Sequence, residues 1–467
     1  MKQIILYNTL TKSKQPFVPI KKSMASIYTC GPTVYAYPQI GNWVAYIRWD
    51  TLVRLLIKNG YNVTRVMNIT DVGHLVSDAD EGEDKLEKGA KREGKTAWEV
   101  ADYYTKDFID GMHKLNLIEP TYITRATDFI EQQKVLIQLL EAKGYTYKIS
   151  DGIYFNTSKF KQYADFARLD LDALKAGARV ENNIEKVNPY DFALWKFTPK
   201  GQKRDMEWES PWGKGFPGWH LECSAMALEK LGATIDIHTG GIDHIPVHHT
   251  NEIAQSQCAT DKKLANYWLH NNFLLVDGAR AAKSLGNAYT LQDLEARGYS
   301  ALDFKMFVLQ SHYRTASNFT WENLDSAKNR LQHWRQTADV IWQPDASCST
   351  NGINADDLTN DFITHLNNDL DTPATLAKID SFMRSLQRAL SKEEIKNVEK
   401  VFKTLEDLFG LQLIRNDITN DQKEIINKRR IAREDNNWQE SDELRMKLEQ
   451  EGINIADLGY GQRWYRN

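Results

Sequence analysis

Two short segments, far apart in the chain, combine glycines with amide or cationic side chains. In the first, residues 26–42, a β-prone run ends at Gly31 and a helical pattern starts after Gly41. A strand, a glycine turn and a helix N-terminus present free backbone N–H groups and the positive end of the helix dipole to an anion. The amide side chains of Gln39 and Asn42 lie in the same turn. The pattern is typical of a phosphate site, and equally of an ordinary turn leading into a capped helix.

The second segment, residues 276–287, carries the cations Arg280 and Lys283 on a loop bounded by Gly278 and Gly286. Two cations on such a loop suit the charge that develops on a leaving phosphate. Neither segment matches a Walker-type phosphate loop or a GxGxxG fingerprint. Taken alone, the second segment is an ordinary basic loop. The presence of both in one chain predicts a site for the phosphates of a nucleotide.

A third group of residues has the chemistry of a metal site. His248 and Glu252 are four residues apart and share one face of the helix that we expect after Pro246. Pro246 is expected to stop this helix before His244, and His249 is expected to point off the shared face. A histidine and a glutamate at this spacing are also common as a simple surface pair.

Two cysteines complete this group. Cys30 ends the β-prone run of the first segment, and Cys223 lies in the helical pattern that begins after Gly218. Together with His248 and Glu252 they form a Cys₂HisGlu set that suits tetrahedral zinc. A buried cysteine is more often a small hydrophobic residue. Spacing alone therefore leaves both interpretations open.

A strand expected at residues 234–238 leads into Gly240 and Gly241, followed by Asp243. At the carboxyl edge of a sheet, a Gly-Gly turn lets a planar ligand approach the backbone closely. A tight turn between a strand and a helix is the alternative.

Composition restricts the class of protein. The chain has 467 residues, is 42% hydrophobic and 26% charged, and is too long for one core. No stretch is long and apolar enough for a membrane span, and no signal peptide is recognised, so we expect a cytoplasmic protein without membrane association. The four cysteines are scattered, which is typical of reduced thiols. A net charge of −4 means that nucleic acid would be met only by local basic patches.

The alternation of strand and helix patterns predicts an α/β domain with a parallel sheet, in two halves at residues 1–125 and 210–315. An insertion is expected between them, at residues 126–209. Beyond residue 316 the β signal vanishes, which predicts a helical bundle at 316–410 and a small terminal unit at 411–467. Helices are expected at residues 44–58, 98–115, 129–143, 321–339, 361–390 and 394–409, strands at 61–67, 152–155 and 267–276, and a solvated loop at 78–91.

With these motifs in order, the sequence resembles the cysteinyl-tRNA synthetases, which are class I aminoacyl-tRNA synthetases. The resemblance runs essentially end to end. It includes Cys-Gly-Pro-Thr-Val-Tyr from Cys30, Asn-Ile-Thr-Asp from Asn68, Leu-Asp-Thr-Pro from Leu370 and the ending from Glu451 to Trp464. It implies a Rossmann-like catalytic domain with an insertion, then an all-α bundle and a small anticodon-binding domain.

The resemblance also implies one Zn²⁺ per chain, held by Cys30, Cys223, His248 and Glu252. Such an ion separates cysteine from serine because a thiol ionises readily on zinc, whereas a hydroxyl ionises far less easily. A pocket based on shape alone discriminates such near-isosteres poorly. The residues implied to contact the substrate L-cysteine are Thr70, Trp219 and His220.

For the nucleotide, the resemblance implies ATP with Mg²⁺. The ATP-binding residues would be Gly31, Gly41, Gly240, Gly241, Asp243 and Lys283. Residues 39–42 match the family's HIGH signature with Gln39 in place of the first histidine, and residues 280–284 match KMSKS with Arg280-Ala281-Ala282 in place of Lys-Met-Ser. The implied catalytic residues are Gln39, Asn42, Arg280 and Lys283. These departures bear on catalytic rate more than on substrate identity.

The implied macromolecular partner is tRNA(Cys), with a monomeric synthetase. Arg429, Arg430 and Trp464 would read unstacked anticodon bases by stacking and hydrogen bonding. Two alternatives stay open. One is a ligase that joins cysteine to an amino sugar, against which the long C-terminal helical region argues. The other is a non-enzymatic paralogue, against which the complete set of metal ligands argues.

Overall fold

The computed structural model describes residues 2–73, 85–169, 184–199, 201, 204–281, 286–345, 348 and 352–467. The chain divides into two compact units. Unit 1 comprises Met1–Leu294 with Tyr313–Asn318, and unit 2 comprises Glu295–His312 with Phe319–Asn467. Residues 295–312, which the sequence pattern grouped with the sheet domain, therefore cluster with the C-terminal unit. No helix in the described part of the chain is long and apolar enough to span a membrane.

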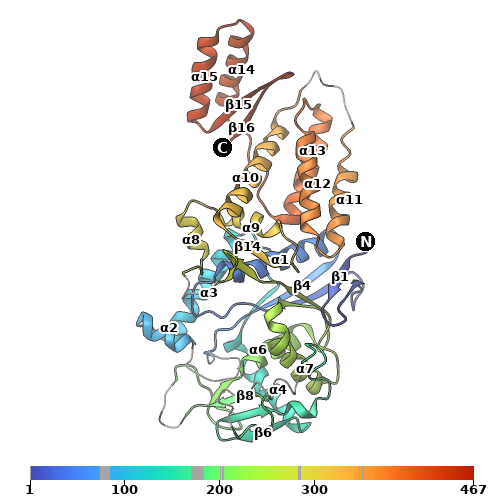
Figure 1. Ribbon diagram of the computed structural model, residues 1–467, viewed down its shortest axis with the longest axis vertical. Helices are drawn as coiled ribbons and strands as arrows, with labels where there is room; N and C mark the ends of the chain where they lie inside the picture. Colours follow the sequence, from blue (N-terminus) through green and yellow to red (C-terminus); the bar gives the residue numbers. More distant parts are fainter. Residues whose placement is uncertain are drawn as a thin grey trace. The chain divides into compact units, whose positions relative to one another are not determined.

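The centre of unit 1 is a five-stranded sheet with the order β11-β10-β3-β4-β5. Figure 1 labels one of its strands, β4. All four neighbouring pairs are parallel, as predicted. The strands are β3 (Met24–Thr29), β4 (Asn62–Ile69), β5 (Tyr122–Arg125), β10 (Ile235–Gly241) and β11 (Ala265–Asn271). The chain moves outward in one direction from β3 and in the other from β10. The carboxyl ends of β3 and β10 thus form a switch point, where open α/β sheets bind ligands.

The helices of the sequence prediction in this unit are confirmed with small shifts. Unit 1 contains α1 (Ile40–Lys58), α2 (Lys85–Glu93), α3 (Ala97–Lys114), α4 (Ile130–Ala142), α6 (Trp219–Leu231) and α7 (Thr250–Thr260), and α8 (Leu291–Ala296) follows at its boundary. The expected loop at residues 78–91 is wrong where it overlaps α2, and residues 78–84 lie outside the described part. Leu86 and Ala90 of α2 are buried. The charge-rich pattern there is the solvated face of an amphipathic helix.

Smaller sheets surround the central one. The insertion folds into a four-stranded antiparallel sheet of β6 (Thr146–Ile149), β7 (Gly152–Phe155), β8 (Phe192–Phe197) and β9 (Gly215–Pro217). Its last strand lies beyond residue 209, where the insertion was expected to end. A hairpin is formed by β1 (Ile5–Asn8) and β2 (Ser13–Pro16), and a three-stranded sheet by β12 (Leu274–Val276), β13 (Ala279–Arg280) and β14 (Ser317–Phe319).

Unit 2 is helical and ends in a β-hairpin. Its elements are α9 (Ala301–Leu309), α10 (Trp321–Ala338), α11 (Ala355–Asn367), α12 (Thr372–Ser385), α13 (Lys392–Phe409), α14 (Asn420–Glu434), α15 (Trp438–Gln450), β15 (Ile453–Leu458) and β16 (Gly461–Arg466). The single helix expected at 361–390 is two helices, because Asp369 and Leu370 adopt positive φ and Asp371 caps a new helix. The expectation of no strand beyond 316 is wrong, since β15 and β16 pair there.

Candidate active site and metal centre

A cavity of about 430 Å³ opens at the switch point of the central sheet. Its wall is built from residues at or just after the carboxyl ends of strands and from the start of α1. Cys30 follows β3, Thr70 follows β4, and Gly240 lies near the end of β10. The sequence-predicted site residues that line it are Cys30, Gly31, Gln39, Gly41, Asn42, Thr70, Trp219, Cys223, Gly240, Gly241, Asp243, His248 and Arg280. Three segments of the sequence prediction, at 26–42, 218–252 and 276–281, therefore meet at one cavity.

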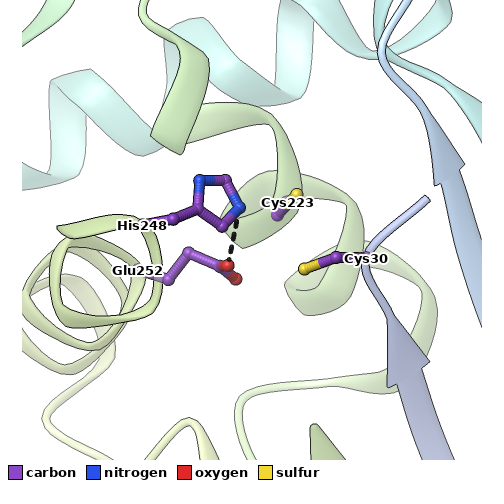
Figure 2. Close-up of side chains that lie close together, drawn as sticks. All are labelled: Cys30, Cys223, His248 and Glu252. Atoms are coloured by element: carbon purple, nitrogen blue, oxygen red, sulfur yellow. Dashed lines mark ion pairs between the residues drawn. The ribbon is translucent and has the colours of Figure 1, made fainter. Parts of the chain in front are cut away.

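The predicted metal ligands point toward one another (Figure 2), and three of them, Cys30, Cys223 and His248, line this cavity. The ligand atoms of Cys30, Cys223, His248 and Glu252 all lie within 4.8 Å of one another, and all four residues are buried. Nε2 of His248 is 3.1 Å from Oε1 of Glu252. Nitrogen and oxygen ligands of one tetrahedral Zn²⁺ are about 3.3 Å apart. The donor set and its spacing thus fit a zinc ion.

A second observation supports the fit. Oε1 of Glu252 is buried and receives no well-aligned hydrogen bond from the described residues. A buried carboxylate oxygen without such a bond is costly, and a cation would satisfy it. This oxygen faces the thiols of Cys30 and Cys223 and the imidazole of His248. These three side chains come from three different segments of the chain. The position suits a metal ligand.

The electrostatics of the four residues are strongly coupled. A hydrogen bond from the Cys30 thiol lowers the pKa of Cys223 to about 7, although burial opposes this. Burial and the neighbouring Cys223 raise the pKa of Cys30 well above its ordinary value. Burial alone would raise the pKa of Glu252, but His238 and His248 hold it at about 2. Burial alone would lower the pKa of His248, but Cys223 and Glu252 raise it to about 10. In the absence of metal, the site is therefore a carboxylate facing an imidazolium.

Two histidines that the sequence prediction did not assign also reach this cluster. Nε2 of His238 lies 2.9 Å from Oε2 of Glu252, and Nε2 of His249 lies 3.3 Å from Sγ of Cys30. Cys30, His238, His249 and Glu252 form a second set of potential ligands with atoms within 4.8 Å. Neither His238 nor His249 lines the cavity, whereas three members of the first set do. The first set therefore reaches the cavity with three ligands, and the second set with Cys30 alone.

The expectation that His249 points away is wrong, whereas the helical segment that leads into α7 does begin after His244, as expected from Pro246. Residues Ile242–His244 form a 3₁₀ turn, and Ile245–His249 continue it as a π turn with Pro246 near its start. Proline is tolerated there because the first turn does not need its N–H. The wider π turn changes the side-chain period, which explains why both His248 and His249 face the cluster.

The assignment of His220 to the cysteine pocket also needs correction. His220 is 1% exposed and does not line the cavity. Its Nδ1 lies 3.0 Å from Nδ1 of His248, so it contacts the metal-site imidazole from behind. Such a contact fixes the orientation of a ligand histidine. Trp219 and Thr70 do line the cavity, and Thr70 donates a hydrogen bond to Oε2 of Glu222 at 2.9 Å.

The side of the cavity where the sequence predicts a nucleotide is shaped by glycines. A Cβ atom on Gly31 would lie 1.7 Å from the carbonyl oxygen of Asn68, and one on Gly240 would lie 2.6 Å from the ring of His249. Only glycine fits at either position. On Gly41, by contrast, a Cβ would meet no described atom within 4 Å, so its backbone is open to the cavity.

The amide and cationic side chains of this region take different positions. Oδ1 of Asn42 accepts a hydrogen bond from the backbone N–H of Gln39 at 2.9 Å, which caps α1. Arg280 stacks its guanidinium over the ring of Phe273 at 4.6 Å and lines the cavity. Lys283 lies outside the described residues.

Cavity residues that the sequence prediction missed include Tyr37 and Asn272. Asn271, which also lines the cavity, ends β11 in the structure but lies inside the strand expected at 267–276, so the expected bounds contained no signal for it.

Two of the three predicted tRNA contacts are buried within unit 2, so their assignment is wrong. Arg429 is 1% exposed and makes two 2.8 Å hydrogen bonds to the carboxylate of Asp457. Trp464 is 5% exposed and packs in the hydrophobic cluster with Leu448 and Ile453. Arg430 is exposed and forms an ion pair with Glu434. The sequence shows basic and aromatic residues in this region but not which side of the hairpin is buried.

The chain is similar to known proteins over its full length. A family profile described as the catalytic domain of class I tRNA synthetases (C) matches residues 16–329. A cysteine–tRNA ligase from Burkholderia lata is 43% identical over 469 residues, which cover 99% of this chain and 97% of the relative. One from Treponema denticola is 40% identical, covering 98% and 99%, and one from Thermus thermophilus is 39% identical, covering 99% of each chain.

Solved structures agree on the fold. Methionyl-tRNA synthetase of Mycobacterium tuberculosis, in complex with methionyl-adenylate, superposes with a TM-score of 0.57 at 15% identity and covers 82% of this chain and 89% of that one. A putative arginyl tRNA synthetase from Campylobacter jejuni gives a TM-score of 0.51 at 14% identity, covering 85% and 95%. By its sequence, its Rossmann-like sheet and its full-length relatives, the chain belongs to the cysteine–tRNA ligase family of class I tRNA synthetases.

Proposed function

We propose that the protein is a cysteine–tRNA ligase, which activates L-cysteine with ATP and transfers it to the terminal ribose of tRNA(Cys). The observation that carries this proposal is the buried set of Cys30, Cys223, His248 and Glu252, of which the first three line the switch-point cavity. Family membership supports the reaction, and the donor set supports the identity of the amino acid. A site that can bind a third sulfur separates cysteine from serine.

In this proposal the four side chains hold one Zn²⁺. The bound ion would supply a Lewis acid that favours an ionised thiol over a hydroxyl. The protein's own residues shape the rest of the pocket: Trp219 walls it, and Thr70 lies at its polar side. His220 and His238 hold the ligands His248 and Glu252 in place by contacts of 3.0 and 2.9 Å.

ATP, with Mg²⁺, is placed on the other side of the same cavity. The adenosine would lie along Gly240, Gly241 and Asp243, where glycines allow close approach to the backbone. The phosphates would lie between the start of α1, with Gln39 and Gly41, and the cations Arg280 and Lys283. The cysteine carboxylate then attacks the α-phosphate in line and pyrophosphate leaves. Catalysis of this step is mainly positioning and electrostatic stabilisation, so no protein nucleophile is needed.

For tRNA, the burial of Arg429 and Trp464 moves the proposed base contacts to exposed residues of the same region. Arg430 remains, and Trp438 and Tyr460 are 54% and 39% exposed, which suits stacking on unpaired bases. We place the enzyme in the cytoplasm as a monomer. The four free cysteines support a reducing compartment.

The experiment is charging of a tRNA(Cys) transcript with labelled cysteine, run beside a panel of small amino-sugar acceptors. We expect transfer to tRNA and none to the amines. Transfer to an amine alone would replace the proposal with an amino-sugar ligase. Cysteine-dependent ATP–pyrophosphate exchange is measured on the same metal-replete protein. No exchange above background would favour a non-enzymatic paralogue that binds without activating.

A further inference from the structure

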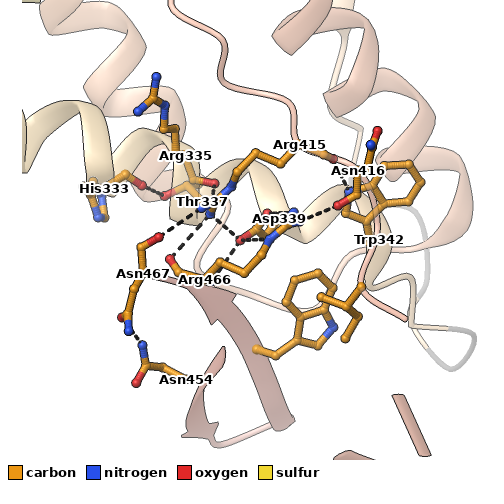
Figure 3. Close-up of polar contacts among 12 residues, drawn as sticks. His333, Arg335, Thr337, Asp339, Trp342, Arg415, Asn416, Asn454, Arg466 and Asn467 are labelled. Carbon is orange, nitrogen blue, oxygen red and sulfur yellow. Dashed lines mark hydrogen bonds and ion pairs between the residues drawn. The ribbon is translucent and has the colours of Figure 1, made fainter. Parts of the chain in front are cut away.

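Unit 2 contains a buried carboxylate that the proposed reaction does not use. Asp339 follows the last residue of α10 and is 1% exposed. It accepts hydrogen bonds from arginines of two other segments (Figure 3). Nη2 of Arg415, in the segment that joins α13 to α14, is 2.7 Å from Oδ2 of Asp339. Arg466, on β16, contacts both carboxylate oxygens of Asp339 through its guanidinium. The backbone N–H of Arg466 also donates a hydrogen bond to Oδ2 of Asp339, at 3.0 Å.

The contacts of Asp339 join two parts of unit 2. We call α10 to α13 the helical bundle, and α14, α15, β15 and β16 the C-terminal module. Asp339 belongs to the bundle, Arg466 to the module, and Arg415 to the segment between them. A buried carboxylate bound by two guanidiniums is a strong, directional connection, and loss of the carboxylate would leave both cations without this partner.

Strand β16 is held to the bundle at two further points. The side chain of Gln343 bonds to both backbone groups of Trp464, donating to its carbonyl at 2.8 Å and accepting from its N–H at 2.9 Å. Arg463 donates to the carbonyl oxygens of Leu386 and Arg388, after the end of α12, at 2.8 and 2.7 Å. Three residues of β16, at positions 463, 464 and 466, are therefore bound to the bundle.

The same strand is part of the module's own core. The indole of Trp464 packs with Ile418, Leu448 and Ile455, and Arg429 of α14 binds Asp457 of the paired strand. Strand β16 thus connects α14 and α15 on one side with the bundle on the other. The orientation of the module on the bundle depends on this strand.

We propose that Asp339 is a positioning residue for tRNA recognition. It holds β16, and with it the exposed surface of α14 and α15, in one orientation on the bundle, so that both surfaces meet the tRNA as one body. A tRNA that touches both surfaces then binds without first ordering the module, which improves affinity for the whole tRNA. The inference rests on the proposed function, because it assumes that unit 2 binds tRNA.

The test is Asp339→Asn, which keeps the shape of the side chain and removes its charge. Cysteine-dependent ATP–pyrophosphate exchange should stay within about twofold of wild type, because that reaction takes place in unit 1. The kcat/KM for full-length tRNA should fall at least tenfold, mainly through KM. Charging of a minihelix that contains only the acceptor stem should not change. Asp357→Asn, an exposed aspartate at the start of α11, is the matched control.

Hydrogen exchange separates positioning from simple unfolding. In Asp339→Asn, amides of β15 and β16 should exchange faster, while those of α14 and α15 stay protected. If the hairpin loosens and kcat/KM for full-length tRNA is unchanged, the proposal is overturned. An equal loss for tRNA and minihelix overturns it as well. Should this variant fail to fold, Arg463→Ala removes two contacts of the same strand. It must likewise lower kcat/KM for full-length tRNA and leave charging of the minihelix unchanged. If wild type charges no tRNA at all, the proposed function fails first.

Discussion

Nε2 of His248 lies 3.1 Å from Oε1 of Glu252, four residues further along the chain, and both side chains are buried beneath the same cavity. The pair spans the junction between a π turn and α7. The two cysteine sulfurs complete the arrangement, one from the residue that follows β3 and one from α6. A buried acid and imidazole at ligand spacing, beside two thiols, are the basis of the account of cysteine selection.

Removal of one sulfur tests that account. Cys223→Ser should lose stoichiometric zinc and raise the KM for cysteine at least tenfold, because a serine hydroxyl hardly ionises on zinc. Zinc content and exchange kinetics are measured on the same preparation. Cys348→Ser, which changes a partly exposed cysteine outside the cluster, should match wild type. A variant at position 223 with full zinc and unchanged KM would contradict the assignment.

Metal uptake should release protons. The pKa of His248 in the metal-free site is about 10, so at neutral pH its imidazole must give up a proton to become a ligand. Burial also raises the pKa of Cys30, whose thiol must ionise. Zinc affinity should therefore increase with pH between 6 and 8. Calorimetric titration of metal-free protein in buffers of different ionisation enthalpy counts the protons. A heat that is independent of the buffer would show that the ligands were already deprotonated.

The contact between His238 and the proposed ligand Glu252 gives a third prediction. His238→Gln replaces the imidazole that lies 2.9 Å from Oε2 of Glu252. Loss of such a partner weakens metal affinity by about 10- to 100-fold. Competition with a chelator measures the change. His113→Gln, at an exposed histidine paired with Glu119, serves as the control. Wild-type zinc affinity in the His238 variant would mean that Glu252 is held in place without this histidine.

Gln39 tests the nucleotide side of the cavity. It stands in the turn before α1, lines the cavity and replaces the first histidine of the family signature. Gln39→His should raise the rate of adenylation, because a protonated imidazole gives a charge-assisted bond to phosphate and the amide does not. Adenylate formation in a single turnover at saturating cysteine gives the adenylation rate. A collapse of activity would show that the turn is built around the amide.

Much of the site could be predicted from the sequence because its parts follow simple periods. The parallel sheet was visible in alternating strand and helix patterns, and its switch point brings Cys30 and Gly240 to one edge. His248 and Glu252 were paired by helical spacing alone. These predictions depend on local sequence patterns alone and not on the structure of the insertion or of unit 2.

What could not be predicted depends on irregular geometry or on burial. A π turn brings His249 to the cluster, and no regular period predicts such a turn. Arg429 and Trp464 look like a basic and aromatic surface in the sequence, yet they are internal to their module. The side of a short hairpin that packs inward is decided by its neighbours, α14 and α15, and these were not identified as helices.

The most direct measurement is ATP–pyrophosphate exchange with cysteine and with serine, before and after the zinc is removed by a chelator. We expect one zinc per chain and a preference for cysteine of at least about a hundredfold. Exchange with cysteine should disappear on removal of the metal and return when zinc is restored. Cysteine-selective exchange that persists in metal-free protein would contradict this expectation.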